Sequence, residues 1–149
     1  MGISVFPAPS AGKTRRVVSL IDGSSWTVPA GVTYVNAKLF GGGGGGGNYA
    51  VEGRGGRVIA TLVTTTPGAS ISYSIGAGGA GGSNAPGDGG TTSFTGAVSA
   101  EGGSTNINNS HSRPTNWEAA GNGGGTVAAN NGSAGAVGGS GKIELEYWL

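Results

Sequence analysis

Glycine tracts limit most strongly what this chain can fold into. Gly41 to Gly47 form an unbroken run, and 35 of the 149 residues are glycine, roughly three times average usage. The surplus of about 25 glycines costs on the order of 12 to 25 kcal/mol of extra chain entropy on folding, whereas net stability is typically about 5 to 15 kcal/mol. We therefore expect the glycines to make contacts that no other residue could make, or neighbouring copies to add burial, and we predict a homo-oligomer.

Outside that run, many glycines recur at every third position. Sets with this spacing are Gly76, Gly79 and Gly82, then Gly78, Gly81, Gly87 and Gly90, and finally Gly132, Gly135, Gly138 and Gly141. A polyproline-II-type helix has three residues per turn, so this spacing creates a face without side chains that another backbone can approach closely. Cα–H···O contacts and N–H···O bonds between segments then become available. The pattern predicts polyglycine-II-type segments packed beside a sheet.

Between the glycine tracts the chain has the alternation of β-strands. Residues 33–40 and 142–148 alternate between apolar and polar side chains, as half-buried strands do. Shorter strands are expected at 91–94 and 97–100, and no segment has sustained helical periodicity. We predict an all-β fold of about seven strands, an antiparallel β-sandwich-like domain with glycine-rich polyglycine-II-type segments.

Two turn dipeptides predict hairpins. Asp22-Gly23 separates the apolar segment 16–21 from residues 24–28, which is typical of a tight two-residue hairpin. Pro67-Gly68 separates the β-branched segment 57–66 from residues 69–75 in a second hairpin-like pair. A further turn is expected at Pro29-Ala30-Gly31.

The chain divides at residue 16. Residues 1–16 contain Pro7 and Pro9 among small side chains, which favours an extended segment over a helix. We interpret 1–16 as an N-terminal docking arm and 17–149 as the glycine-rich β domain.

Charge and hydropathy exclude several classes of partner. The formal net charge is only +1, which argues against a nucleic-acid-binding protein, because such proteins usually present a basic face. No stretch of 18 apolar residues indicates membrane insertion, and the N-terminus lacks the apolar core of a secretory signal. There is no cysteine and hence no disulfide or thiol chemistry.

Two phosphate-binding patterns lack the context that they require. Gly12-Lys13-Thr14 ends like a P-loop, but Pro7 stands where the first glycine is needed, and a strand rather than a helix is expected afterwards. Residues 76–81 satisfy GxGxxG, a match that chance supplies in so glycine-rich a chain, and no helix follows. Neither pattern predicts a nucleotide site.

Catalytic groups are equally sparse. His111 is the only histidine, and nothing places a serine and an aspartate beside it. Glu144 and Glu146 share one face of a strand, but Lys142 beside them favours a solvated outer face over acid–base chemistry. The chain is predicted not to be an enzyme and to use no metal or other cofactor.

One polar excursion, residues 104–120, interrupts the glycine-rich sequence. A tryptophan face can stack on a pyranose while amide, guanidinium and carboxylate groups bind its hydroxyls. Alternatively, the tryptophan pins the loop to its own sheet. The candidate ligand-binding residues are Asn109, His111, Arg113, Asn116, Trp117 and Glu118.

The order of motifs from Ser25 to Trp148 resembles the glycine-rich domain of bacteriophage tail-fibre and other virion surface proteins. The matching segments are SWTVPAGVTYVNAKLFGGGGGGG, GGRVIATLVTTTPGASISYSIGAGGAGG, GDGGTTSF, VSAEGG and GGSGKIELEYW. In such proteins loops between glycine tracts bind host-surface glycans or proteins, and the 104–120 excursion occupies the matching position.

The resemblance implies a non-enzymatic virion protein at a tail-fibre or tail tip, assembled with other virion proteins, frequently as a trimer, and contacting a host-surface glycan. The chain lacks a fibrous shaft before its arm, so a head decoration or fibre-base protein without receptor binding is the alternative. Two further hypotheses are an enzyme acting on surface polysaccharide and an ice-binding protein, against which the irregular tract lengths argue.

Overall fold

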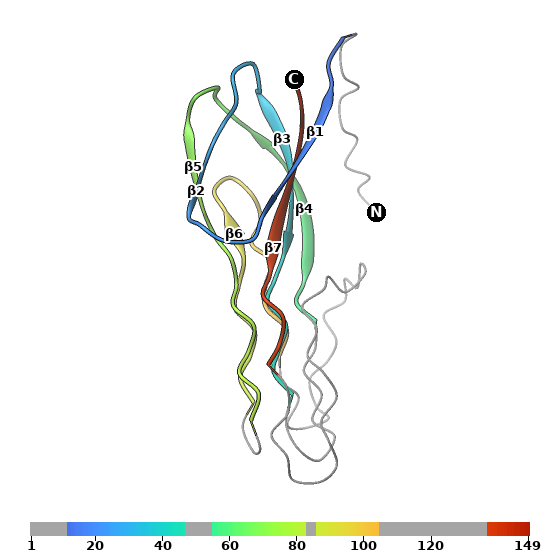
Figure 1. The fold of residues 1–149 in the computed structure, drawn as a ribbon, viewed down its shortest axis with the longest axis vertical. Coiled ribbons are helices and arrows are strands. Elements are labelled where there is room, and N and C mark those ends of the chain that lie inside the picture. The colour runs from blue at the N-terminus through green and yellow to red at the C-terminus, as the bar shows by residue number, and fades with distance from the viewer. Residues whose placement is uncertain (1–11, 47–54, 83–85, 105–136) are drawn as a thin grey trace.

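Two antiparallel sheets make up the strand region, which confirms the predicted all-β, sandwich-like fold (Figure 1). The computed structural model describes residues 12–46, 55–82, 86–104 and 137–149. Within these ranges the strands are β1 (Arg15–Leu20), β2 (Ser25–Thr27), β3 (Tyr34–Phe40), β4 (Val58–Thr64), β5 (Ser70–Ser74), β6 (Ser93–Phe94) and β7 (Lys142–Trp148). The larger sheet has the order β1-β7-β3-β4 and the smaller sheet the order β2-β5-β6.

Strands β3 and β7 form the middle of the larger sheet because one face of each is apolar. Val35, Ala37 and Leu39 of β3 are fully buried, as are Ile143 and Leu145 of β7. The register places Leu39 opposite Ile143 and Ala37 opposite Leu145, so the two apolar faces form one surface. The alternation predicted for both segments is confirmed.

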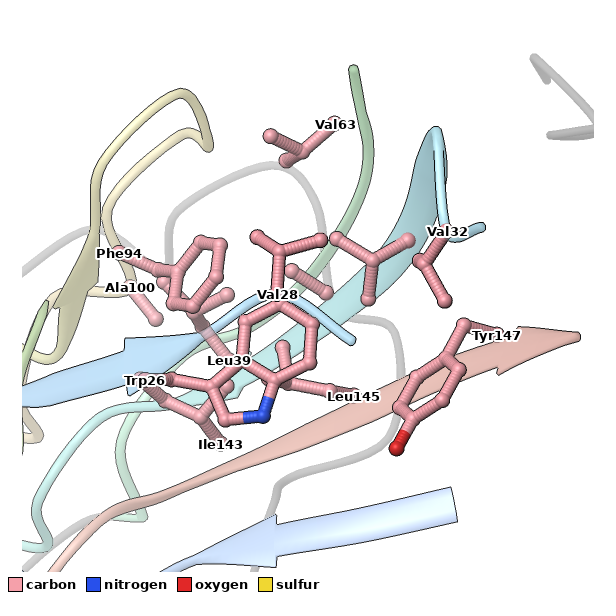
Figure 2. Close-up of a cluster of buried hydrophobic side chains, with 12 residues drawn as sticks. Trp26, Val28, Val32, Leu39, Val63, Phe94, Ala100, Ile143, Leu145 and Tyr147 are labelled. Carbon is pink, nitrogen blue, oxygen red and sulfur yellow. The ribbon is translucent and has the colours of Figure 1, made fainter. Parts of the chain in front are cut away.

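Aromatic rings from both sheets close the core between them (Figure 2). Trp26 of β2 lies between Phe94 and Tyr147, with ring centroids 6.3 and 5.7 Å away and interplanar angles of 47° and 48°. Such tilted arrangements bring ring edges toward ring faces, which the aromatic quadrupoles favour. The core thus joins β2 of the smaller sheet to β7 of the larger one.

The predicted hairpin at Pro67-Gly68 is wrong in its pairing but right in its turn. The Ala69 amide donates to the Thr66 carbonyl, and Gly68 has a φ of +80°, which glycine adopts without strain at the third position of such a turn. However, β4 pairs with β3 and β5 pairs with β2, so the turn carries the chain from one sheet to the other. Burial of two apolar faces against each other overrides local pairing here.

The predicted hairpin at Asp22-Gly23 is also wrong. β1 pairs with β7 in the larger sheet, and β2 pairs with β5 in the smaller one. The Tyr73 hydroxyl donates a 2.6 Å hydrogen bond to the carbonyl of Asp22, which fixes the crossing to β5. Asp22-Gly23 leads the chain from one sheet to the other. In the sequence, such a dipeptide looks the same whether the strands on either side of it pair with each other or join different sheets.

Between residues 91 and 100 the strands are shorter than expected. β6 contains only Ser93 and Phe94, and an isolated antiparallel bridge joins Thr92 to Ala100. The predicted strand at 97–100 is thus reduced to its last residue. At Pro29-Ala30-Gly31, by contrast, the turn is confirmed, since the Val32 amide donates to the Pro29 carbonyl and Gly31 has a φ of +79°.

The described ends of the chain lie together at one end of the sandwich. The amides of Thr14 and Leu149 each donate to the other residue's carbonyl, at 2.6 and 3.0 Å, and so extend the β1–β7 ladder by one pair. Residues 1–11 of the predicted arm lie outside the described residues. From Arg15 onward, residues that the sequence assigned to the arm belong to β1.

We predict that Leu145→Ala lowers the free energy of unfolding by roughly 2 to 5 kcal/mol, because it removes a fully buried side chain between the two sheets. Val98→Ala is the matched control, since Val98 is 60% exposed and the loss of its side chain should cost less than about 1 kcal/mol. Urea unfolding followed by tryptophan fluorescence measures both. Equal losses would contradict the assignment of these two residues to core and surface.

Candidate functional site

The structure leaves the predicted ligand-binding residues undescribed. Asn109, His111, Arg113, Asn116, Trp117 and Glu118 all lie within 105–136, outside the described residues. The site can therefore be built only from the frame that the chain leaves at Ser104 and rejoins at Val137.

This frame is a bundle of six glycine-rich tracts that extends beyond the sandwich (Figure 1). Three tracts lead away from the strands and three lead back toward them. The outgoing tracts are 41–46, 76–82 and 101–104, and the returning tracts are 55–57, 86–91 and 137–141. We call these six segments the glycine bundle.

Hydrogen bonds between tracts of the glycine bundle recur every third residue. Donor first, they join Gly42 to Gly90 and Gly45 to Gly87, and they join Gly79 to Gly43 and Gly82 to Gly46, with lengths of 2.8 to 3.1 Å. The first pair runs antiparallel and the second runs parallel. A repeat of three is the periodicity of the polyproline-II conformation, whose amides and carbonyls point outward and are free to bond to neighbours. The predicted packing of backbone against backbone is present.

Tract 41–46 occupies the centre of the bundle. It exchanges backbone hydrogen bonds with each of the other tracts, and all six of its residues are buried. A Cβ added at Gly45 would come closer than 3.0 Å to the carbonyl of Ala80, a separation that real Cβ atoms essentially never show. A Cβ at Gly41, Gly42 or Gly44 would likewise come closer than 3.0 Å to neighbouring backbone, so none of these four positions can carry a side chain. This close packing accounts for glycine at these four positions of the run.

The outer tracts follow a different rule, in which two glycines are followed by one other residue. Within a tract these other residues stand three apart, with the exception of Pro86, which lies two residues before Asp88 and is buried. The exposed ones are Ala77 and Ala80, Asp88 and Thr91, Glu101, and Val137 and Ser140. Each outer tract therefore packs inward with glycine and meets solvent with every third residue.

Thr92 connects the glycine bundle to the sandwich. Its side chain is fully buried, and its hydroxyl donates to the Phe40 carbonyl at 2.7 Å and accepts from the Gly76 amide at 2.9 Å. Phe40 ends β3, and Gly76 begins the second outgoing tract. One hydroxyl thus satisfies a carbonyl and an amide where strands give way to glycine.

The direction of the tracts places their described outer ends on one side of the sandwich. Three tracts run away from the strands and three run back, so the described ends at Gly46, Gly82 and Ser104 and at Gly55, Pro86 and Val137 all lie on the side of the strands that the bundle occupies. The connection between Ser104 and Val137 carries the predicted site residues. Its two ends are held by bonded glycine tracts, since the amide of Gly103 donates to Gly42 and that of Gly138 to Gly79.

The outer face of the larger sheet is a second polar surface; the sequence predicted it for Lys142, Glu144 and Glu146, but not the ion pair of Arg15 with Glu146. Lys142 lies 2.7 Å from Glu144, and Arg15 pairs with Glu146; these carboxylate side chains are 34% and 25% exposed. Exposed pairs of this kind contribute about 0 to 1 kcal/mol. The glutamates were expected on a solvated face, but their partial burial depends on β7 lying between β1 and β3, which no local pattern predicts.

On the same face, cations lie over one aromatic ring. The ammonium groups of Lys38 and Lys142 are 5.1 and 4.6 Å from the ring centroid of Phe40. Next to them Asn36 has a side-chain oxygen that is buried and has no hydrogen-bond partner. This arrangement offers cation–π contacts and one hydrogen-bond acceptor. The two carboxylates just described, those of Glu144 and Glu146, are each paired with a cation.

Metal and membrane sites can be assessed for the described residues only. Within these ranges no group of three or more His, Cys, Asp or Glu side chains is placed to hold a metal ion. Nor does this part of the chain form a helix long and apolar enough to cross a membrane.

Comparison with protein families gives one match. A family model described as a glycine-rich domain matches residues 19–147. This range contains both sheets, except the first four residues of β1 and the last residue of β7, and all the glycine tracts. No curated protein matches the chain.

We predict that Gly79→Ala destabilises the fold by roughly 3 kcal/mol, because the added Cβ would meet the backbone of Gly87 and Gly45 at less than 3.0 Å. Ala80→Ser, one residue along the same tract, points to solvent and should change stability by less than about 0.5 kcal/mol. Thermal and urea unfolding measure the difference. A tolerated Gly79→Ala would contradict close backbone packing.

We also predict that Thr92→Val costs about 2 kcal/mol or more, because the Phe40 carbonyl and the Gly76 amide lose their shared partner in a buried site. Thr92→Ser keeps the hydroxyl and should retain most of the stability. Calorimetric unfolding of the two variants tests this, and an equal loss for both would assign the effect to the methyl group instead.

Proposed function

The chain belongs to the glycine-rich domain family, and from that premise we propose that it is a non-enzymatic bacteriophage virion surface protein that recognises the host cell. Its arm attaches to other virion proteins, and the loop carrying Trp117 contacts a host-surface glycan or protein. The copies assemble as a homo-oligomer, for which a trimer is favoured.

The observation that carries this proposal is the polarity of the molecule. The described chain begins at Gly12, beside the paired Thr14 and Leu149, at the end of the sandwich farthest from the glycine bundle (Figure 1). Tracts 101–104 and 137–141, between which the loop carrying Trp117 stands in the sequence, belong to the glycine bundle on the opposite side of the sandwich. A protein that docks through its N-terminal arm and binds through its loops needs this separation.

The glycine bundle supports the same role. Surface loops lose conformational entropy when they bind a ligand, and holding their ends rigid lowers that cost. Here both ends of the 105–136 connection lie on tracts bonded to the buried central tract 41–46. Binding residues on loops positioned by a rigid scaffold are a common arrangement for recognition.

We predict that the purified protein binds host cells or a component of a glycan array, and that Trp117→Ala weakens this binding by about tenfold or more, because tryptophan is prominent among residues that dominate binding energy. Ser112→Ala, in the same loop, is the matched control. Surface plasmon resonance gives the affinities, and an unchanged melting temperature excludes loss of an anchor for the loop.

Failure to bind any cell or glycan would overturn the receptor-binding role. If immunogold labelling then still located the protein on particles, the alternative of a head decoration or fibre-base protein would hold. Absence of label from particles would overturn the virion assignment as a whole.

A further inference from the structure

Both edges of the larger sheet are open in the part of the chain that the structure describes. β1 pairs only with β7, and β4 pairs only with β3, so each presents a row of backbone amides and carbonyls on its other side. Edges of this kind are templates for pairing with another strand, and proteins normally cover, bend or charge them. β4 (Val58–Thr64) has seven residues with no charge and no proline, so its own sequence provides neither of these protections.

The directions of the two edge strands are complementary. β4 follows a returning tract of the glycine bundle and runs away from it, whereas β1 begins at the end far from the bundle and runs toward it. If a second copy stands beside the first with its long axis in the same direction, β4 of one copy and β1 of the next are antiparallel. The alternation of the sheet then continues from copy to copy without a break.

Apolar side chains mark the same face of both edges. Val17 of β1 is 52% exposed and Leu62 of β4 is 38% exposed. The register runs from Val17 through Glu146 and Asn36 to Leu62, so all four side chains project from the outer face. Pairing of β1 with a neighbouring β4 brings an exposed valine and an exposed leucine onto one surface, where apolar cross-strand pairs stabilise a sheet.

From these three features we infer that β4 of one copy pairs with β1 of the next, in a head-to-tail contact that closes into a ring of identical copies. The inference rests on the proposed function for one premise, namely that all copies point their loops the same way. To the proposed homo-oligomer, the inference adds which strand edges meet and how neighbouring copies are oriented. A head-to-tail contact closes when the rotation between copies divides a full turn, and three copies match the favoured trimer.

Pairing of β4 with itself is the rival contact. An antiparallel β4–β4 joint requires a twofold axis that reverses the long axis, so that the two sets of loops would face opposite ways. Such a dimer could not attach both arms to one particle surface and present both loop ends outward. The two contacts are distinguished by which cysteine variants become cross-linked.

The chain has no cysteine, so disulfide trapping can report the contact directly. Leu62→Cys is combined in turn with Arg15→Cys, Val17→Cys or Ser19→Cys, which sample three registers on one face of β1. Val17 and Leu62 of one copy lie three strand spacings apart, about 14 Å, which exceeds the roughly 7 Å limit between Cα atoms for a disulfide. A bond between them can therefore form only between copies.

We expect one of these three double variants to give a covalent species of three times the chain mass on non-reducing electrophoresis. The Leu62→Cys/Ser72→Cys control, whose second cysteine lies on the middle strand of the smaller sheet, should give none. Covalent dimers from Leu62→Cys alone would indicate β4–β4 pairing and overturn the inference. So would failure of all three double variants to cross-link.

A charge variant provides an independent readout. Val17→Lys/Leu62→Lys places like charges on the two facing edges, and light scattering should show its mass fall to that of a single chain, with an unchanged far-UV circular dichroism spectrum. Ser72→Lys should keep the mass of the wild-type ring. A monomeric wild type, or a double variant that keeps the ring mass, would overturn the inference.

These measurements use purified protein without receptor or particle. Loss of the ring would leave receptor binding to be decided by the array. Failure on the array would leave the cross-links in place, so the two proposals can fail separately.

Discussion

Contact between backbones without intervening side chains is the constraint on which the rest of the structure depends. The central tract 41–46 is enclosed by five other tracts, and its amides and carbonyls are shared among them. Such contacts are individually weak, and they become effective through number and regular spacing. The entropic disadvantage of glycine is offset here by a kind of packing that any larger residue would prevent.

The sandwich and the glycine bundle are successive parts of the same ladders. β3 continues into the central tract at Gly41, and the outer tract 137–141 continues into β7, so both middle strands of the larger sheet extend into the bundle. At the junction the two-residue repeat of the strands gives way to the three-residue repeat of the glycine tracts. There the Thr92 hydroxyl bonds to the Phe40 carbonyl and the Gly76 amide. Burial of apolar side chains stabilises the sandwich, and close contact between backbones stabilises the glycine bundle.

Local patterns in the sequence predicted the elements well and their partners poorly. The alternation in 142–148 and the period of three near Gly79 could be identified because each reflects the immediate surroundings of the chain. The turns at Asp22-Gly23 and Pro67-Gly68 were correctly placed, but their dipeptides specify a reversal and not which sheet the next strand joins. That choice depends on contacts such as those of Trp26 with Phe94 and Tyr147, which are distant in sequence. The predicted binding residues lie between Ser104 and Val137, so their arrangement remains a prediction.

Hydrogen bonds at intervals of three also govern how such a molecule can change in length. Adding one or two residues to an outer tract would rotate its exposed position, such as Ala80, into the bundle and move its amides out of phase with their acceptors. Lengthening the bundle requires whole steps of three in facing tracts at once. Variation in the length of the bundle is therefore stepwise.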